Sequence, residues 1–422
     1  MKRTLATIAF LTTATAATAL LSACSSSPAA EQGEGPVRLT FWHGYTAADG
    51  DTFNKIITNF NASQDEVEIQ PSVKTWAVIQ NSLLPALSAE QGPQLVALPG
   101  EQLPVYAGKG AMAELDDYYA SSPEAAKINP AAIDMEVVEG KKYGVPTGFV
   151  PLSVIYNKTM FAQAGITTFP TTWAQWVQAA QQLTLDNDGD GTPEQYGLAL
   201  PDHETVANGV WASLFASGGG SLVDGDTATV NSPANQQTLA FWSQAVQNGK
   251  ISPTGLDGIK SDDLFSAGKA AMEIAGPWMA SVAQENGIDY ALAPIPAGPS
   301  AQVASAIGIS MGVTAQADEA EQAAAEKFFD YFLSPEVATQ WSLGSGWPPL
   351  RTDVPASALA ENPVAASLTA MAPLAQPLLP GVVNSADVLA AVDEATQKAL
   401  AGADPAAALE AAQPKVQEAL ND

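Results

Sequence analysis

Apolar and polar positions near residue 37 follow first a strand period and then a helix period. Apolar side chains alternate along "VRLTFW" (37–42), recur at helical spacing over residues 53–60, and alternate again along "VEIQPSV" (67–73). A strand, a helix and a second strand in this order predict a parallel sheet with a right-handed crossover. Ligands of such sheets bind at the carboxyl ends of the strands. His43 and Tyr45 directly follow the first strand and are therefore candidate ligand-binding residues.

Helix starts further along the chain are marked by capping residues. Thr172 and Gln175 have the spacing of a capping box, and an apolar stripe that includes Trp173 and Trp176 follows them. We expect these two tryptophans to lie in the core rather than against a ligand. A polar residue followed by proline marks two later helix starts, Ser334-Pro335 and Asp404-Pro405.

The first residues of the chain have the pattern of a secretory signal peptide. Lys2 and Arg3 precede an apolar segment that ends at "LSAC" with Cys24, the only cysteine. "LSAC" resembles the lipobox of bacterial lipoproteins, whose cysteine is diacylated and becomes the new N-terminus. Acyl chains supply stable membrane anchoring. We therefore expect a signal peptide over 1–23, lipidation of Cys24, a flexible tether over 24–35, and a location on the extracellular face of the bacterial cytoplasmic membrane.

Composition and charge narrow the classes of partner. The chain of 422 residues is long enough for two domains, and a charged fraction of 15% favours a folded chain. Removal of residues 1–23 takes away Lys2 and Arg3, which lowers the formal net charge from −28 to −30. Binding to nucleic acid needs a basic surface, because the protein must neutralise phosphates. We expect no nucleic-acid partner.

Residues suited to metal or nucleophilic chemistry are few. The chain has two histidines, His43 and His203, and no cysteine after Cys24, which argues against a transition-metal site. The string "GISMG" around Ser310 matches the nucleophile-elbow pattern, but no histidine follows it in the chain. The sequence also lacks a phosphate loop of the Walker type. A hydrolase on the nucleophile-elbow pattern is therefore excluded, and we expect no cofactor and no metal.

The stretch "LDNDGDGTPEQYGL" (185–198) resembles a calcium loop. Three aspartates occupy the first, third and fifth positions of an EF-hand loop, namely Asp186, Asp188 and Asp190. The twelfth position requires a glutamate with two coordinating oxygens, and here it is Gly197. We interpret the stretch as a polar turn that joins a helix to a strand. A structural calcium ion, held by the three aspartates and Glu194, is the alternative.

Three longer stretches resemble signatures of the family 1 extracellular solute-binding proteins, the sugar-binding lipoproteins of ABC importers. These stretches include "YGVP" and "YNK" within 140–176, "FSAGKAAMEIAGPW" within 264–279, and "FLSPEVATQW" within 326–354. Together with the opening "FWHG" and the lipobox, the resemblance covers nearly the whole chain. It implies a type II periplasmic-binding-protein fold like that of maltose-binding proteins. In this fold two α/β lobes, each a mainly parallel sheet flanked by helices, are joined by hinge strands. The ligand binds between the lobes, and a monomeric receptor delivers it to an ABC permease.

The resemblance also implies where the chain crosses between the lobes. By analogy, the crossings lie near residues 147–151, 293–296 and 333–340. We therefore expect lobe I to consist of 36–148 and 294–338, and lobe II of 149–293 and 339–422.

The chemistry of a sugar indicates which side chains could bind it. Sugar rings present C–H faces that stack on aromatic planes, and hydroxyls that hydrogen-bond to planar polar groups. The family places the tryptophan of "GPW", here Trp278 after Gly276, against the ligand, and Trp347 occupies its late loop "GSGWPP". Further candidates lie in loops or at the expected hinge: Trp76, Glu101, Thr147, Asp202 and Trp211. Near Glu101 the sequence departs from the family, because Gln94 replaces its usual aspartate.

Three functions remain open from the sequence. The first is a receptor for a neutral mono- or oligosaccharide. The second is a secreted glycosidase, which needs two carboxyl groups at about 5–5.5 Å or about 6.5–9.5 Å. The third is a receptor for a glycerophosphodiester or polyol. A phosphate favours arginine, and only Arg38 and Arg351 remain after removal of the signal peptide.

Overall fold

The computed structural model describes residues 35–203 and 209–421, and residues 36–422 group into one compact unit. The expected signal peptide, Cys24 and nearly all of the tether lie outside the described residues. Within the described ranges, no helix has both the length and the apolar composition that a membrane span requires.

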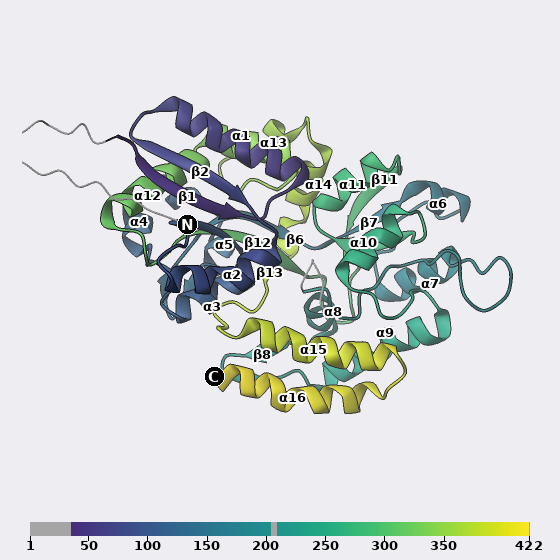
Figure 1. Ribbon diagram of the computed structural model, residues 1–422. Coiled ribbons are helices and arrows are strands. Elements are labelled where there is room, and N and C mark those ends of the chain that lie inside the picture. Colours follow the sequence, from purple (N-terminus) through teal and green to yellow (C-terminus); the bar gives the residue numbers. More distant parts are fainter. Residues whose placement is uncertain (1–34, 204–208, 422) are drawn as a thin grey trace, which may run out of the picture. The chain divides into compact units, whose positions relative to one another are not determined.

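A six-stranded sheet forms the first half of the body (Figure 1). Its strands are β1 (Val37–His43), β2 (Val67–Val73), β3 (Leu95–Pro99), β6 (Val145–Pro151), β12 (Ala304–Val313) and β13 (Ala375–Pro377). Their order is β13-β12-β3-β1-β2, with β6 also paired to β12. β1 runs parallel to β2 and β3, whereas β12 runs antiparallel to β3 and β6. The predicted β-α-β unit is confirmed, because α1 (Ala47–Ser63) connects β1 to β2.

Helices and short elements surround this sheet. The α-helices are α2 (Trp76–Ser88), α3 (Leu103–Gly108), α4 (Asp116–Ser121), α5 (Pro130–Asp134), α12 (Glu319–Leu333), α13 (Pro335–Ser345) and α14 (Pro363–Met371). Single 3₁₀ turns occur at Gly100–Gln102, Ala125–Lys127, Ala356–Leu359 and Ala372–Leu374, and a small ribbon pairs β4 (Val137–Val138) with β5 (Lys141–Lys142). The first core is aromatic: Phe41, Phe53, Phe328 and Trp341 are buried in it and meet in edge-to-face contacts.

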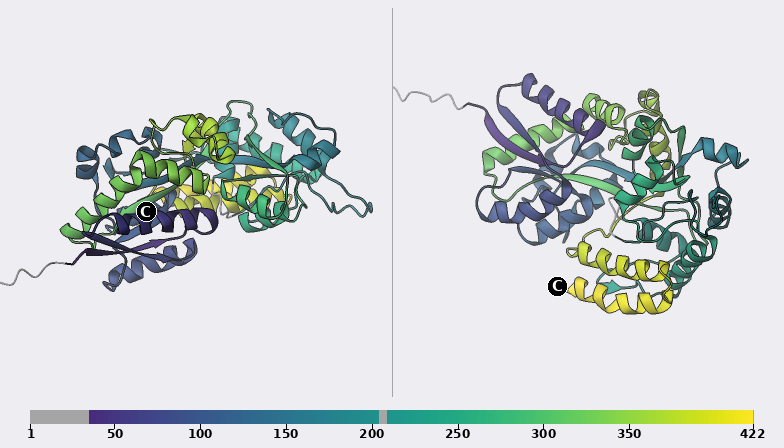
Figure 2. Two further views of the ribbon diagram at one scale, coloured as in Figure 1. Left: turned by 90° about the horizontal axis from the view of Figure 1, so that it is seen from above. Right: turned by 45° about the vertical axis from the view of Figure 1, so that its right-hand side comes forward.

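A three-stranded sheet and a second set of helices form the other half. The sheet has the order β10 (Met272–Ala275), β7 (Ser153–Asn157), β11 (Tyr290–Pro294). Its helices are α6 (Lys158–Gln163), α7 (Trp173–Leu183), α8 (Val210–Gly218), α9 (Pro233–Gly249), α10 (Gly258–Ser266), α11 (Trp278–Glu285), α15 (Ser385–Leu400) and α16 (Pro405–Asn421). β8 (Val223–Asp224) and β9 (Thr227–Ala228) form a small ribbon. The last two helices lie side by side in every view (Figures 1 and 2). Trp173 and Trp176 pack in this second core, as predicted.

Strand direction in the second sheet differs from the mainly parallel arrangement expected. β7 runs antiparallel to both β10 and β11. Among the described residues of this half, parallel pairing occurs as isolated bridges, such as Ala199 to Glu273 beside β10. β10 and β11 flank β7 and both run opposite to it, so the three-stranded sheet is antiparallel. The periodicity of a strand sequence carries no information on the direction of its neighbours.

Strands β6 and β12 connect the two cores. Phe149 and Val150 of β6 belong to the first core, and Leu152, directly after the strand, belongs to the second. β12 passes in the opposite direction, from Ala304 in the second core to Ala306 in the first. Four buried residues that the expected boundaries assign to lobe II pack in the first core, namely Trp341, Trp347, Leu350 and Leu368. The boundary after residue 338 therefore falls too early for these residues.

Two of the three predicted helix starts carry the expected cap. The Thr172 hydroxyl accepts from the Gln175 N–H at 3.4 Å, and the Asp404 carboxylate accepts from the Ala407 N–H at 2.8 Å. Ser334 differs, because its hydroxyl donates backward to the Tyr331 carbonyl oxygen at 2.7 Å. Helix α13 thus begins at Pro335 without a side-chain cap.

Candidate functional site

Three of the predicted tryptophans rest on glycine residues. A Cβ placed on Gly44 would lie 2.3 Å from the Trp76 ring, and one on Gly148 would lie 2.3 Å from the Trp347 ring. The same holds for Gly276, where the distance to the Trp278 ring would be 2.1 Å. Each indole is thus held against bare backbone, which fixes its plane. Rigid aromatic planes of this kind suit stacking against the face of a ligand ring.

Tyr45, Thr147 and Trp76 come together at the carboxyl end of β1. The Tyr45 hydroxyl hydrogen-bonds to the Thr147 hydroxyl, which itself donates to the Ile309 carbonyl oxygen at 3.0 Å. Trp341 donates its indole N–H to the Thr147 carbonyl oxygen at 2.8 Å. The Tyr45 ring meets Trp76 and Trp341 edge to face. Tyr45 and Thr147 are almost fully buried, so they hold this region in place from the protein interior.

Asp49, in the first turn of α1, was not predicted from the sequence. Burial raises the pKa of its carboxyl to about 6, although the Trp347 indole and the backbone N–H groups of its own turn donate to it. Asp49 therefore connects the start of α1 to Trp347, whose ring packs on Gly148. An acidic residue in a first helical turn is so common a helix-dipole feature that no pattern in the sequence distinguishes Asp49 as a site residue.

His43 lies in the protein core next to this region and is not part of it. Its side chain is fully buried at the end of β1, packs on the Phe41 and Phe53 rings, and hydrogen-bonds to the Asn54 amide oxygen at 3.2 Å. Burial lowers the pKa of the imidazole to about 4. The ring is therefore neutral at physiological pH and occupies a core position.

Glu101 follows the end of β3 and lies in the 3₁₀ turn Gly100–Gln102. β3 is parallel to β1, so Glu101 is at the same edge of the sheet as Tyr45. Its carbonyl oxygen accepts a hydrogen bond from the Ser385 hydroxyl. Gln94, which replaces the aspartate of the family, is a structural residue: its side chain accepts from the Thr40 N–H and donates to Glu321.

Trp278 begins α11 and is only partly buried. Its indole N–H donates to the Asp262 carboxylate of α10 at 3.3 Å. A Cβ placed on Gly346 would lie 4.0 Å from Pro277, so the loop that carries Trp347 meets the loop that carries Trp278. The structure therefore brings together Tyr45, Trp76, Thr147 and Trp347 around the end of β1, and the backbone before Trp347 approaches Pro277, which lies between Gly276 and Trp278.

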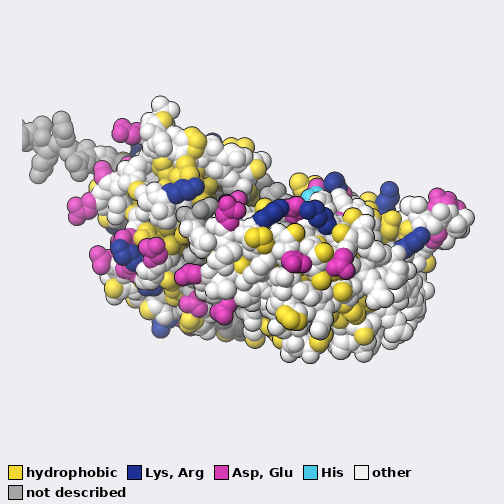
Figure 3. All heavy atoms as spheres, turned by 90° about the horizontal axis from the view of Figure 1, so that it is seen from below, with side chains coloured by type: hydrophobic (Ala, Val, Ile, Leu, Met, Phe, Trp, Pro, Cys, Tyr) yellow, Lys and Arg dark blue, Asp and Glu magenta, His cyan; other side chains and the backbone are white. Residues whose placement is uncertain are grey.

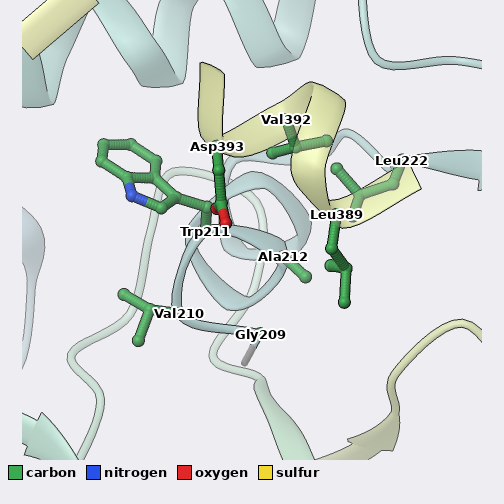
Figure 4. Close-up of a pocket in the computed structure, with 8 residues that line it drawn as sticks. All are labelled: Gly209, Val210, Trp211, Ala212, Leu222, Leu389, Val392 and Asp393. Carbon is green, nitrogen blue, oxygen red and sulfur yellow. The ribbon is translucent and has the colours of Figure 1, made fainter. Parts of the chain in front are cut away.

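Asp202 and Trp211 occupy a different place. The Asp202 carboxylate is buried and accepts from the Gly255 N–H at 2.5 Å, and it pairs with the His203 ring at 2.7 Å. Trp211 donates its indole N–H to the Pro201 carbonyl oxygen at 2.9 Å. A pocket between α8 and α15 borders Trp211, whose indole extends away from Leu222 and Leu389 (Figure 4). These contacts describe packing, and none of them connects the two residues to the three glycine-backed tryptophans.

The aspartate turn is exposed, and its own backbone N–H groups hydrogen-bond to its carboxylates. Side-chain oxygens of Asp186, Asp188 and Glu194 lie within 4.8 Å of one another. Backbone N–H groups of the turn donate to all three. Gly197 fits tightly, since a Cβ there would lie 2.0 Å from the Ala180 carbonyl oxygen. A coordinating glutamate at this position would therefore clash with α7. The turn follows α7 as predicted, but the segment after it makes isolated bridges, such as Tyr196 to Ala270, in place of the predicted strand.

The side chains around the end of β1 suit a ligand with ring faces and hydroxyls. They are indoles, hydroxyls, the Asp49 carboxyl and, at the same edge of the sheet, the Glu101 carboxyl. Such groups can stack on a ring and exchange hydrogen bonds with hydroxyls. On the face shown in Figure 3, acidic and basic side chains are interspersed.

Known proteins resemble the chain in sequence and in fold. A binding protein of Brucella abortus is 24% identical over 376 residues, which cover 87% of this chain and 89% of the relative. The maltotriose-binding protein of Pyrococcus abyssi is 25% identical over 333 residues, or 77% and 68% of the two chains. The maltose/maltodextrin-binding domain MalE from Bdellovibrio bacteriovorus, solved with maltotriose, has a TM-score of 0.79 at 24% identity, covering 92% of this chain and 100% of that one.

The likeness of fold confirms the two-lobed α/β class predicted from the sequence. Residues 55–368, about three quarters of the chain, match the family model of the bacterial extracellular solute-binding protein. Members of this family are binding proteins. The chain belongs to the bacterial extracellular solute-binding proteins.

Proposed function

We propose that the chain is the receptor of an ABC importer, and that it binds a neutral mono- or oligosaccharide and delivers it to a membrane permease. The observation that carries the proposal is the set of three indoles, Trp76, Trp278 and Trp347, each backed by a glycine. Two of them, Trp76 and Trp347, come from the first half of the fold, and Trp278 comes from the second. A sugar held between them would contact both halves at once.

Relatives support the choice of ligand class. One relative is named for maltotriose, and the structural neighbour from Bdellovibrio was solved with maltotriose bound. Both are near 25% identity, so they support a carbohydrate without indicating which one. The proposed receptor is a monomer, anchored to the extracellular face of the membrane through lipid on Cys24 of the lipobox "LSAC".

A phosphate-bearing ligand is less well supported than a sugar. Arg38 pairs with Glu68 at 2.9 Å, and Arg351 pairs with Glu124 and Asp353. Both arginines are therefore engaged away from the tryptophans, and the described site offers no guanidinium to a phosphate. A polyol would need no charge and remains the alternative ligand for the same receptor.

A glycosidase is also less well supported. Asp262, which accepts from the Trp278 indole, is partly buried and hydrogen-bonds to the fully buried Glu273. Two carboxyl groups in direct contact leave no room for a glycosidic bond between them, because glycosidases separate theirs by about 5 Å or more. This acid pair therefore has a geometry unlike that of a catalytic pair.

Calorimetry on residues 36–422 tests the proposal. Maltotriose, mannobiose, tagatose, a polyol and glycerol 3-phosphate are titrated into the protein, and each mixture is then analysed for products. We expect saturable binding of at least one sugar with no product. Turnover of an oligosaccharide, or binding of glycerol 3-phosphate alone, would contradict the proposal.

The variant Trp278→Ala tests the site. Loss of a stacked indole removes about 1.5–3 kcal/mol of apolar contact, which corresponds to an affinity loss of about 10- to 100-fold for the bound sugar. Leu185→Ala, a truncation of an exposed apolar residue in the aspartate turn, is the control and should bind like the wild type. Unchanged affinity in Trp278→Ala would remove Trp278 from the site.

A further inference from the structure

We propose that Asp262 and Glu273 form a carboxyl pair that shares one proton and holds the indole of Trp278 in its binding position. The inference rests on the proposed function, because it assigns positioning residues to a tryptophan of the proposed sugar site. The pair lies behind the indole and has no contact with the ligand in this proposal.

Glu273 is an acid in the interior of a sheet. It lies in the middle of β10, opposite Ile155 of β7, and is bridged on its other side to Ala199. Its side chain is 1% exposed, and its Oε2 is buried without a hydrogen-bond donor among the described residues. An ionised carboxylate in this position would have lost its hydration with no cation to compensate. Glu273 is therefore held in the protonated form.

Asp262 is the acceptor for two groups. The Trp278 indole donates to its Oδ2 at 3.3 Å, and Glu273 hydrogen-bonds to it from β10. A carboxylate accepts and cannot donate, and so a bond between two carboxyl groups requires a proton on one of them. The burial of Glu273 assigns the proton to it, which leaves Asp262 ionised and able to accept from the indole.

The directions of the pKa shifts agree with this assignment. Burial raises the pKa of Glu273 well above its usual value, and donation to Asp262 raises it further. The hydrogen bonds from Glu273 and Trp278 lower the pKa of Asp262, although burial raises it more. Two acids this close titrate as a unit, with one proton bound over a wide range of pH.

The surroundings add no positive charge to the pair. On α10 the neighbour Asp263 is another acid and raises the pKa of Asp262. The Lys260 ammonium on the same helix is engaged with Asp257 at 3.3 Å. β7 contributes the apolar Ile155, the 196–199 segment contributes Ala199, and α11 has its charged residue, Glu285, at its far end. The proton of Glu273 is thus what keeps the pair together.

Loss of that proton would release the indole. Above the upper pKa of the pair, the carboxylate of the buried Glu273 would face that of the partly buried Asp262, and their repulsion would move Asp262 away from Glu273. Trp278 would then lose a fixed hydrogen-bond acceptor. We therefore expect the environment of the indole N–H to change with pH in the protein without any ligand.

Nuclear magnetic resonance on the indole N–H groups of residues 36–422 tests this directly. The Trp278 signal is assigned by its loss in Trp278→Phe, and its shift is followed from pH 5 to pH 10. We expect a titration step well above pH 4.5 in the wild type and its loss in Glu273→Gln. The control Glu285→Gln removes an exposed acid from the helix that carries Trp278, and it should keep the step.

A flat Trp278 signal in the wild type would overturn the proposal, and so would a step that persists in Glu273→Gln. The wild-type titration does not depend on whether a variant folds. Asp262→Asn gives a second check: the amide oxygen can still accept from the indole, and the like charge is removed. We expect its step to move to lower pH, and an unchanged step would contradict the pairing.

Affinity measured against pH links the pair to binding. We expect wild-type affinity for maltotriose to fall about tenfold, or about 1.4 kcal/mol, as the pH rises through the step, since the indole loses a hydrogen bond to a charged group. Glu273→Gln should lose this dependence. If maltotriose and the other sugars fail to bind, the proposed function fails, whereas the indole titration still decides whether the pair holds Trp278.

Discussion

At the scale of single residues, the glycine beneath Trp347 should be as important as the indole itself. Gly148→Ala places a Cβ 2.3 Å from the ring, which forces Trp347 to move and breaks its contact with Asp49. We expect a loss of about 1–3 kcal/mol in the free energy of unfolding, as for other overpacked sites. Denaturant unfolding measures this.

The partner substitution distinguishes this clash from a general effect on β6. In a Trp347→Ala background the ring is gone, so the additional cost of Gly148→Ala should nearly vanish. Costs that simply add in the double variant would show that the glycine is needed for another reason.

A second buried acid makes stability depend on pH. Glu136 is fully buried and accepts from the Ser310 hydroxyl at 2.8 Å, and burial raises its pKa to about 8. Between its ordinary pKa of 4.5 and about 8, the folded protein keeps a proton that the unfolded chain has released. The free energy of unfolding should therefore fall as the pH rises through this window, by up to about 1.4 kcal/mol per pH unit, and should level off above it.

Glu136→Gln should remove that contribution. Measured by thermal denaturation between pH 5 and pH 8, the variant should gain on the wild type as the pH rises. Glu114→Gln, the same substitution at an exposed residue paired with Lys141, is the control. A constant difference between Glu136→Gln and the wild type across this range would contradict the raised pKa.

For single residues, some predictions from the sequence agree with the structure and others do not. The family motif identifies Trp278 and Trp347, and the strand-end position identifies Tyr45. The structure packs the two tryptophans on glycines and Tyr45 against other aromatic rings. His43 has the same strand-end position as Tyr45 but turns into the core. Asp262 and Glu273 carried no sequence signal, because their pairing depends on how α10 packs on β10. Whether such acids are buried depends on tertiary packing, which a local sequence pattern does not report.

At the scale of elements, local patterns predicted where elements begin and what type they are. The β-α-β unit, the helix that starts at Trp173 and the helix that starts at Pro405 all form. Alternation and helical spacing are properties of a single segment, and therefore they can be read from it. The direction of β10 and β11 relative to β7 depends on how the chain returns from distant helices, and only the structure provides it.

At the scale of the whole molecule, β6 and β12 are the strands through which the two cores connect. We expect the two halves to approach each other about these strands when a sugar binds, because the indoles that contact it are divided between them. Small-angle scattering on residues 36–422 should show a smaller radius of gyration with the bound sugar than without it.

A sugar that calorimetry shows not to bind is the control for that measurement, and Trp278→Ala at the same sugar concentration is a second control. An unchanged radius at saturation would mean that the ligand is held without a rearrangement of the two halves.

The position of β12 in the chain also affects how the protein folds. This strand, residues 304–313, pairs with β3, β6 and β13, so the first sheet lacks a central member until three quarters of the polypeptide has been made. Pairing between residues so far apart in sequence slows folding. The N-terminal half therefore stays without its complete sheet during synthesis.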